Sequence, residues 1–120
     1  MENIRSIRPF VGAQDYDLSR QFYIDLGFEE VELGPDMSLF KMASIAFYLQ
    51  RAYVKDWVDN TMLFVEIADL NSFHKQLVAR DLTVKYPAVR VSSIRTQDWG
   101  RVCFVHDPSG VLWQFGSFEQ

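Results

Sequence analysis

Hydrophobic positions along this chain follow a helical period in two segments and strand-like runs elsewhere. The helical pattern covers Asp15 to Leu26 and again Asp69 to Arg80, with apolar residues three or four positions apart. The Asp that opens each segment can accept a hydrogen bond from a free backbone N–H of the first turn. Gly27 and Asp81 stand directly after the two segments, and both residue types tolerate the left-handed conformation that ends many helices. The pattern therefore predicts two helices of about three turns each.

Runs of strand length precede and follow each predicted helix. The segments Ile7 to Gly12 and Thr61 to Ile67 come before the two helices. Residues 51–60 link the two halves and include a predicted helical turn at residues 54–58. Residues 87–100 form a long polar loop, and loops of this kind often bind ligands. The strands predicted after the helices are Phe28 to Leu33, Ser38 to Met42 and Ser44 to Gln50 in the first half, and Leu82 to Tyr86, Arg101 to His106 and Val111 to Phe115 in the second.

The two halves repeat weakly at an offset of 54 positions. Phe10 matches Phe64 (64−10) in the strand before each predicted helix, and Asp15 matches Asp69 (69−15) at the start of each helix. This order predicts an α+β fold of two βαβββ modules, with the first at about residues 1–52 and the second at about residues 61–120. The length of 120 residues suits one domain that contains both modules.

Alternation within the strands separates a core face from a face with mixed chemistry. In the strand at residues 61–67, the aliphatic set Leu63, Val65 and Ile67 is expected to lie under the helices. The opposite set has the mixed character of a cavity lining. Together with the corresponding positions of the first and last strands, this opposite set predicts a concave surface. Alternatively, its two charged members, Arg8 and Glu66, lie at a sheet edge that is exposed to water. The predicted surface consists of Arg8, Phe10, Met62, Phe64, Glu66 and Gln114.

A hairpin near the C-terminus holds the strongest binding signal in the chain. Asp98, Trp99 and Gly100 precede an apolar strand, which runs into the turn Asp107-Pro108-Ser109-Gly110. Pro and Gly favour a tight turn here, and the second apolar run completes a β-hairpin. A Trp beside a Gly in a loop is suited to stack on a flat ligand, although a Trp in such a place can also cover the core.

Composition and charge exclude several classes of protein and of binding partner. Hydrophobic residues make up 48% and charged residues 23%, as in a folded globular protein, and no apolar run is long enough to cross a membrane. The net charge of −4 argues against nucleic acid as a partner and mildly favours cationic ligands. No apolar stretch typical of a secretion signal follows the N-terminus, so we expect a cytoplasmic protein. The single cysteine, Cys103, falls within a predicted strand and is expected to be a buried thiol.

These motifs together resemble the vicinal-oxygen-chelate superfamily, which includes glyoxalases, dioxygenases and bleomycin-resistance proteins. The resemblance extends over nearly the whole chain and is strongest to the bleomycin-resistance group, although Val111 stands where Asn usually follows the turn Gly. It implies a curved mixed-sheet cup with helices on its outer face, and a homodimer with ligand grooves between the subunits. The motifs that carry it are Leu26-Gly27-Phe28, Trp99-Gly100-Arg101 and Asp107-Pro108-Ser109-Gly110.

The resemblance also provides a test for a catalytic metal. Metal ligands in the superfamily come from the first and last strands of each half, which project here onto Arg8, Met62, Gln114 and Tyr48. Arg stays protonated and Met offers a soft thioether, so only Gln114 is a plausible ligand for a hard divalent cation. The two histidines do not complete a set of metal ligands, because we expect His74 on the outer face of the second helix and His106 at a strand end. We therefore expect neither a metal nor another cofactor.

The sequence favours binding over catalysis. The preferred hypothesis is metal-independent sequestration of a flat, cationic, bleomycin-like compound in a groove between the subunits of a homodimer. Trp99 would stack on the ligand, Glu66 and Asp98 would meet positive charge, and an apolar cup would consist of Phe10, Phe40, Tyr48 and Phe64. Two alternatives stay open: a metal-dependent lyase, isomerase or dioxygenase of the same superfamily, and a binder of an unrelated metabolite. General acid–base chemistry by Glu66 would lack an evident partner.

Overall fold

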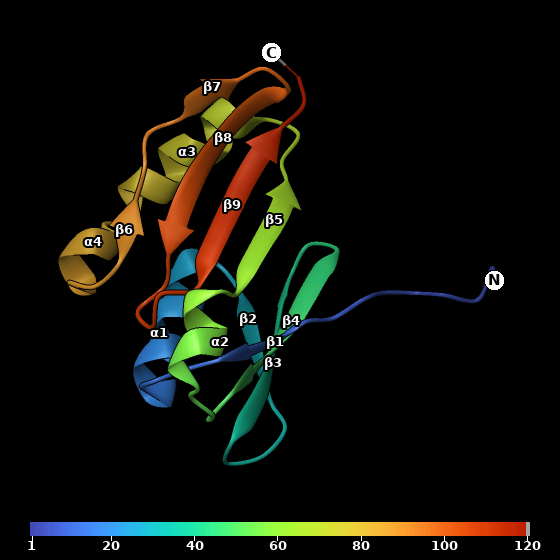
Figure 1. Cartoon of the computed structure of the whole chain (residues 1–120), viewed down its shortest axis with the longest axis vertical. Coiled ribbons are helices and arrows are strands. Elements are labelled where there is room, and N and C mark those ends of the chain that lie inside the picture. The colour runs from blue at the N-terminus through green and yellow to red at the C-terminus, as the bar shows by residue number, and fades with distance from the viewer. Residues whose placement is uncertain (120) are drawn as a thin grey trace.

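A computed structural model of the chain describes residues 1–119, and its strands form two sheets (Figure 1). The N-terminal sheet has the strand order β1-β4-β3-β2, with β1 parallel to β4 and the other neighbours antiparallel. The C-terminal sheet has the order β5-β9-β8-β6, with β5 parallel to β9 and a short β7 paired to β8. The strands are β1 (Phe10–Gly12), β2 (Glu29–Glu32), β3 (Met37–Met42), β4 (Ile45–Gln50), β5 (Met62–Glu66), β6 (Arg90–Val91), β7 (Arg95–Gln97), β8 (Gly100–His106) and β9 (Leu112–Ser117).

The two long helices begin and end where the sequence predicts. Helix α1 spans Tyr16–Leu26 and helix α3 spans Leu70–Ala79. The side chains of Asp15 and Asp69 each accept a hydrogen bond from the backbone N–H three residues later, at 3.1 Å. Gly27, at φ +123°, and Asp81, at φ +53°, follow the helices in positive-φ conformations. These contacts confirm the predicted caps, and the mixed architecture confirms the α+β fold class.

The segment predicted as a strand at Leu82 to Tyr86 is instead a short helix, α4 (Leu82–Lys85). The left-handed Asp81 turns the chain, and its carbonyl accepts hydrogen bonds from the N–H groups of Val84 and Lys85. Leu82 is buried, and the Tyr86 hydroxyl donates to Asp25 on α1 at 2.5 Å. Tertiary contacts at both ends therefore override the strand propensity of this segment. The edge strand of the C-terminal sheet is instead β6, which lies within the predicted polar loop. A second short helix, α2 (Lys55–Asp59), lies in the linker between the two halves.

A buried hydrogen-bond network joins the two halves of the chain. The Tyr23 hydroxyl on α1 donates to Asp107 Oδ2 at 2.6 Å and accepts from Trp113 Nε1 at 2.9 Å. Asp107 Oδ1 accepts from the N–H groups of Ser109 and Val111, and Ser109 Oγ accepts from the N–H of Gln14. The Asp-Pro-Ser-Gly turn therefore connects the C-terminal hairpin to the first half of the chain.

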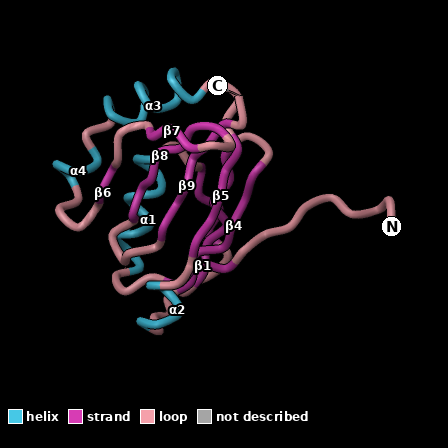
Figure 2. The backbone as a smooth tube through the Cα atoms, turned by 45° about the horizontal axis from the view of Figure 1, so that its top comes forward, coloured by secondary structure: helices cyan, strands magenta, loops and turns pink. Residues whose placement is uncertain are grey.

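Each sheet has one face on the core and one open face. Leu63, Val65 and Ile67 pack against the core, as the alternation predicts. The strand register assigns the other residues of β5 to the C-terminal open face, which consists of Met62, Phe64, Glu66, Arg90, Arg95, Val102, Phe104, His106, Leu112, Gln114 and Gly116. The N-terminal open face includes Phe10, Val31, Leu39 and Tyr48. An N-terminal arm, residues 1–8, extends away from both sheets (Figure 2).

Candidate functional site

Three aromatic side chains, Phe64, Trp99 and Phe118, meet on the C-terminal open face and form what we call the aromatic cluster. The Trp99 ring centroid lies 5.8 Å from that of Phe64 and 5.5 Å from that of Phe118, with the ring planes inclined by 65° and 55°. Phe64 and Phe118 are 5.8 Å apart. Each of the three side chains is exposed, between 42% and 56%. Trp99 therefore lies at the surface and does not cover the core.

Two glycines make room for the aromatic cluster. Asp98 and Trp99 form the turn between β7 and β8, and the strand pairing places Gln97 opposite Gly100. Gly100 has φ +154°, and a Cβ on it would lie 2.1 Å from the carbonyl oxygen of Ser117. A Cβ on Gly116 would lie 2.6 Å from Phe64 Cζ, so the Phe64 ring rests directly on the β9 backbone. A side chain at either position would move the rings apart.

Phe118 is a member of the aromatic cluster that the sequence pattern does not predict. It follows β9, where the Phe-Gly-Ser run indicates the end of a strand more than a binding residue. A Gly inside an apolar strand can mark the close approach of another group, and Gly116 is the signal that could have found the cluster. The group that approaches Gly116 is the Phe64 ring, and Phe64 is too far away in the sequence for the two to be connected from the pattern alone.

A second aromatic pair lies on the N-terminal open face. Phe10 and Tyr48 face each other across β1 and β4 and stack with centroids 4.8 Å apart and planes 24° apart. Arg8 Nη1 donates to the Tyr48 hydroxyl at 3.1 Å. Within residues 1–119, Arg8 and Glu66 form no ion pair. Phe10 is 57% exposed, so this pair offers an apolar surface to a ligand or to another protein chain.

Phe40, expected in the apolar cup, is a core residue and does not reach either open face. Its side chain is fully buried, and its ring stacks on Phe47 with centroids 5.5 Å apart. The register explains the difference, because Leu39 and not Phe40 pairs with Tyr48. Successive residues of a strand point to opposite faces, so the open-face residue of β3 at this row is Leu39.

The projected metal positions carry few donors. Gln114 pairs with Phe64, and Met62 pairs with Leu112 on the same face. Within residues 1–119, no three His, Cys, Asp or Glu side chains gather closely enough to hold a metal ion. An amide oxygen and a thioether are a poor donor set for a hard divalent cation, so these residues do not fit a superfamily metal.

A cleft of about 740 Å³ lies beside β5, between the C-terminal open face and the base of the N-terminal arm. Phe64 and Glu66 line one wall and connect the cleft to the aromatic cluster. Arg5 and Arg8 line the arm side, and Ile45 belongs to the β4 side. The cleft therefore brings together the predicted residues Arg8, Phe64 and Glu66.

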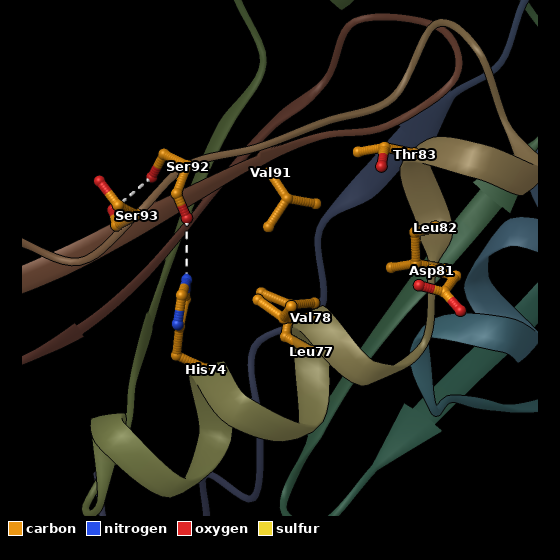
Figure 3. Close-up of a pocket in the computed structure, with 9 residues that line it drawn as sticks. All are labelled: His74, Leu77, Val78, Asp81, Leu82, Thr83, Val91, Ser92 and Ser93. Carbon is orange, nitrogen blue, oxygen red and sulfur yellow. Dashed lines mark hydrogen bonds between the residues drawn. The ribbon is translucent and has the colours of Figure 1, made fainter.

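A smaller crevice of about 300 Å³ lies between α3, α4 and the segment after β6 (Figure 3). Leu77, Val78 and Val91 form its centre in this view. His74 Nε2 donates to the carbonyl oxygen of Ser92 at 2.9 Å, so this side chain is half-buried against the loop and does not lie on the outer face of the helix. The crevice is mainly apolar and holds none of the predicted binding residues.

Cys103 is fully buried in β8, as its place in an apolar run predicts. Burial raises the pKa of the Cys103 thiol to about 11. A thiol in that state is neutral at physiological pH, and the thiolate is the nucleophilic form. Cys103 is therefore a packing residue, and the chemistry of the open faces rests on aromatic, acidic and basic side chains.

The overall architecture is similar to solved structures of binding proteins and enzymes. A bleomycin-binding protein from Streptomyces verticillus, complexed with copper(II)-bleomycin, is 22% identical with a TM-score of 0.82, covering 98% of each chain. TnmS3, an antibiotic binding protein from Streptomyces sp. CB03234, is 18% identical with a TM-score of 0.72, again covering 98% of each chain. Lactoylglutathione lyase from Agrobacterium tumefaciens is 18% identical with a TM-score of 0.70, covering 97% of this chain and 96% of the lyase.

No protein-family model and no curated protein sequence matches the chain. At the identities of the solved structures, the likeness establishes the fold. Within residues 1–119, no helix is both long enough and apolar enough to cross a membrane.

Proposed function

We propose that this chain, which has the fold of the vicinal-oxygen-chelate superfamily in the form seen in bleomycin-binding proteins, binds and sequesters a flat, cationic small molecule. The observation that carries the proposal is the exposed aromatic cluster of Phe64, Trp99 and Phe118 on the C-terminal open face. Stacking of a flat ring on an aromatic side chain contributes about 1–3 kcal/mol per ring. The solved bleomycin-binding structure of similar fold supports a ligand of the bleomycin class.

The carboxylates around the aromatic cluster favour a cationic ligand, while Arg5 and Arg8 line the far side of the adjoining cleft. Glu66 pairs with Gly116, on which Phe64 rests, and both residues lie on the C-terminal open face. Asp98 adjoins Trp99 in the hairpin turn, and Glu119 follows Phe118; all three carboxylate residues are exposed. A cation near aromatic faces gains from the ring quadrupole as well as from the carboxylates.

The spacing of the rings indicates that the ligand stacks on one side of the cluster. A flat ring inserted between two aromatic side chains needs them about 7 Å apart, because each stacked contact takes about 3.5 Å. The three centroid separations are 5.5–5.8 Å, so the rings already contact one another. A second wall for the ligand must therefore come from outside the cluster.

We propose that a second copy of the chain supplies this wall, in a homodimer with the binding groove at the subunit interface. In its Phe10–Tyr48 pair the two rings stack and Phe10 is exposed, which is the geometry and accessibility that a second wall requires. Ile4 and Ile7 of the N-terminal arm are 77% and 92% exposed, which is unfavourable for a lone chain in water. Association would bury these groups together with the aromatic cluster and the Phe10–Tyr48 pair.

The proposed binding is independent of metal, because Met62 and Gln114 are a poor donor set at the superfamily's metal positions. Gln114 and Met62 remain in the groove as ligand contacts, since both lie beside Phe64 on the C-terminal open face. An amide side chain offers both a donor and an acceptor to a polar group of the ligand.

The test is a fluorescence titration of the purified protein with metal-free bleomycin, after metal analysis of the sample. We expect saturable quenching, and we expect Trp99→Ala to weaken binding tenfold or more, since 1.4 kcal/mol is a factor of ten. Trp57→Phe is the matched control because Trp57 is 74% exposed on α2, apart from the cluster. Equal affinity of Trp99→Ala and wild type would refute the site. An absence of quenching would refute a bleomycin-class ligand, and stoichiometric metal would favour an enzyme.

A further inference from the structure

A separate cavity of about 240 Å³ lies at the end of the C-terminal sheet, next to the Asp-Pro-Ser-Gly turn. Ala88 and Arg90 line one side, His106 lines the other, and residues 107–110 close its end. A water molecule takes up about 30 Å³ of liquid, so the cavity has room for a polyatomic ion with a small group attached. None of the residues of the aromatic cluster lines this cavity.

Two basic side chains meet in the cavity without a partner from the protein. Arg90 on β6 and His106 on β8 are directly opposite in the antiparallel pairing, so both project to the same face. Within residues 1–119, neither side chain forms a hydrogen bond or an ion pair. Their N–H groups are therefore available to an anion.

The nearby carboxylates are engaged elsewhere. Asp107 lines the cavity, but its two oxygens accept hydrogen bonds from the Tyr23 hydroxyl and from backbone N–H groups of the turn. Asp59 lies near Gly110 and pairs with Lys55 Nζ at 2.8 Å. The groups that remain to bind a ligand are the guanidinium of Arg90 and the imidazole of His106.

We propose that this cavity is a binding site for a phosphate-class oxyanion, either the free ion or the phosphoryl group of a small molecule. The planar guanidinium of Arg90 donates two parallel hydrogen bonds to two oxygens of such a group. An imidazole N–H of His106 donates to a third oxygen from the neighbouring strand. The volume of the cavity beyond the ion accommodates a short organic substituent.

This site is spatially separate from the proposed ligand groove. Two strands, β8 and β9, lie between β6 and β5, so Arg90 and Phe64 are three strand spacings apart, or about 14 Å. Binding of an anion at Arg90 and His106 therefore does not depend on the aromatic cluster. Either proposal can fail while the other holds.

The experiment is a titration of the ¹⁵N-labelled full chain with inorganic phosphate at low ionic strength, followed by NMR. We expect saturable shifts at residues 88–90 and 106–110, and we expect Arg90→Ala to weaken phosphate binding about tenfold or more. His106→Gln keeps a neutral N–H donor and should weaken binding less than His106→Ala. Arg95→Ala is the matched control, because Arg95 lies over the Phe104 ring on the same sheet and does not line the cavity.

A parallel titration with methyl phosphate distinguishes the two sources of the anion. Equal binding of both compounds supports recognition of the oxyanion alone, and tighter binding of the ester supports a phosphorylated small molecule. Saturable shifts that survive both Arg90→Ala and His106→Ala would overturn the site, as would no saturable shift with either compound. If His106→Ala fails to fold, the exposed Arg90→Ala decides the question by itself.

Discussion

Single residues determine how the aromatic cluster is assembled, and Gly116 shows this most directly. The Phe64 ring rests on the β9 backbone because Gly116 has no side chain, and Trp99 and Phe118 then pack around that ring. Gly100 is required in the hairpin turn for the same reason, because the Ser117 carbonyl oxygen lies where a Cβ would be. The aromatic cluster therefore requires glycine at positions 100 and 116 as well as the three aromatic rings.

Gly116→Ala is expected to disrupt the aromatic cluster and to weaken ligand binding. The new Cβ would lie 2.6 Å from Phe64 Cζ, so the ring must move. Overpacking of this kind costs about 1–3 kcal/mol of stability, and we expect affinity for bleomycin to fall about tenfold. Urea unfolding and the fluorescence titration measure the two effects.

The matched control for this substitution is Gly34→Ala, because a Cβ on Gly34 meets no atom within 4 Å. It adds the same methyl group in open space and should leave the affinity unchanged. Wild-type affinity in Gly116→Ala would show that the position of Phe64 does not matter for binding.

At the scale of elements, helix α1 is tied to β2 by charge and to the C-terminal hairpin by buried hydrogen bonds. Arg20 on α1 donates to both oxygens of Glu30 on β2, at 2.6 and 3.1 Å, and also contacts Glu32. Ser38 on β3 donates to the same Glu30 carboxylate at 2.7 Å. These contacts hold the helix against the N-terminal sheet, while Tyr23 holds it against the turn at Asp107.

The Glu30 contacts predict a specific pH dependence of stability. Burial acts to raise the pKa of Glu30, but hydrogen bonds from Arg20 and Ser38 and the charge of Arg20 together hold this pKa below its ordinary value. A carboxyl group whose pKa is lower in the folded chain than in the unfolded chain stabilises the fold above the unfolded pKa, near 4.3, and loses this effect as the pH falls through the folded pKa.

We therefore expect the free energy of unfolding of wild type to fall more steeply than that of Glu30→Gln below about pH 4.5. Urea unfolding from pH 7 to pH 3 measures the two slopes. Glu29→Gln is the control, since Glu29 is an exposed neighbour on β2. Parallel pH profiles for wild type and Glu30→Gln would contradict the assignment.

At the scale of the whole molecule, the lone chain leaves apolar surface uncovered on both open faces and along the N-terminal arm. Phe10, Phe64 and Phe118 are each more than 40% exposed, and Ile7 is almost entirely exposed. Patches of this kind on a folded chain mark interaction surfaces. The dimer proposed above accounts for them together with the one-sided geometry of the aromatic cluster.

Ile7→Asp is expected to shift the protein from dimer to monomer. Burial of one Ile side chain contributes about 1.5–3 kcal/mol, and a two-fold dimer would lose this contribution twice. Sedimentation velocity over a range of concentrations measures the change. Val84→Asp is the control, because Val84 is 79% exposed on α4 and belongs to neither open face. A wild type that stays monomeric at high concentration would refute the dimer.

The sequence by itself determined the helices, their caps, most of the strands and the two faces of β5, because these follow from local hydrogen bonding and from periodicity. It also pointed to Trp99, since a Trp and a Gly in one hairpin are close along the chain. Tertiary structure alone decided that Leu82–Lys85 is helical, that Phe40 belongs to the core and that Phe118 joins Phe64 and Trp99. The aromatic cluster joins residues far apart in sequence. The other two depend on packing contacts and on the strand register, which outweigh local propensity and turn a side chain inward or outward.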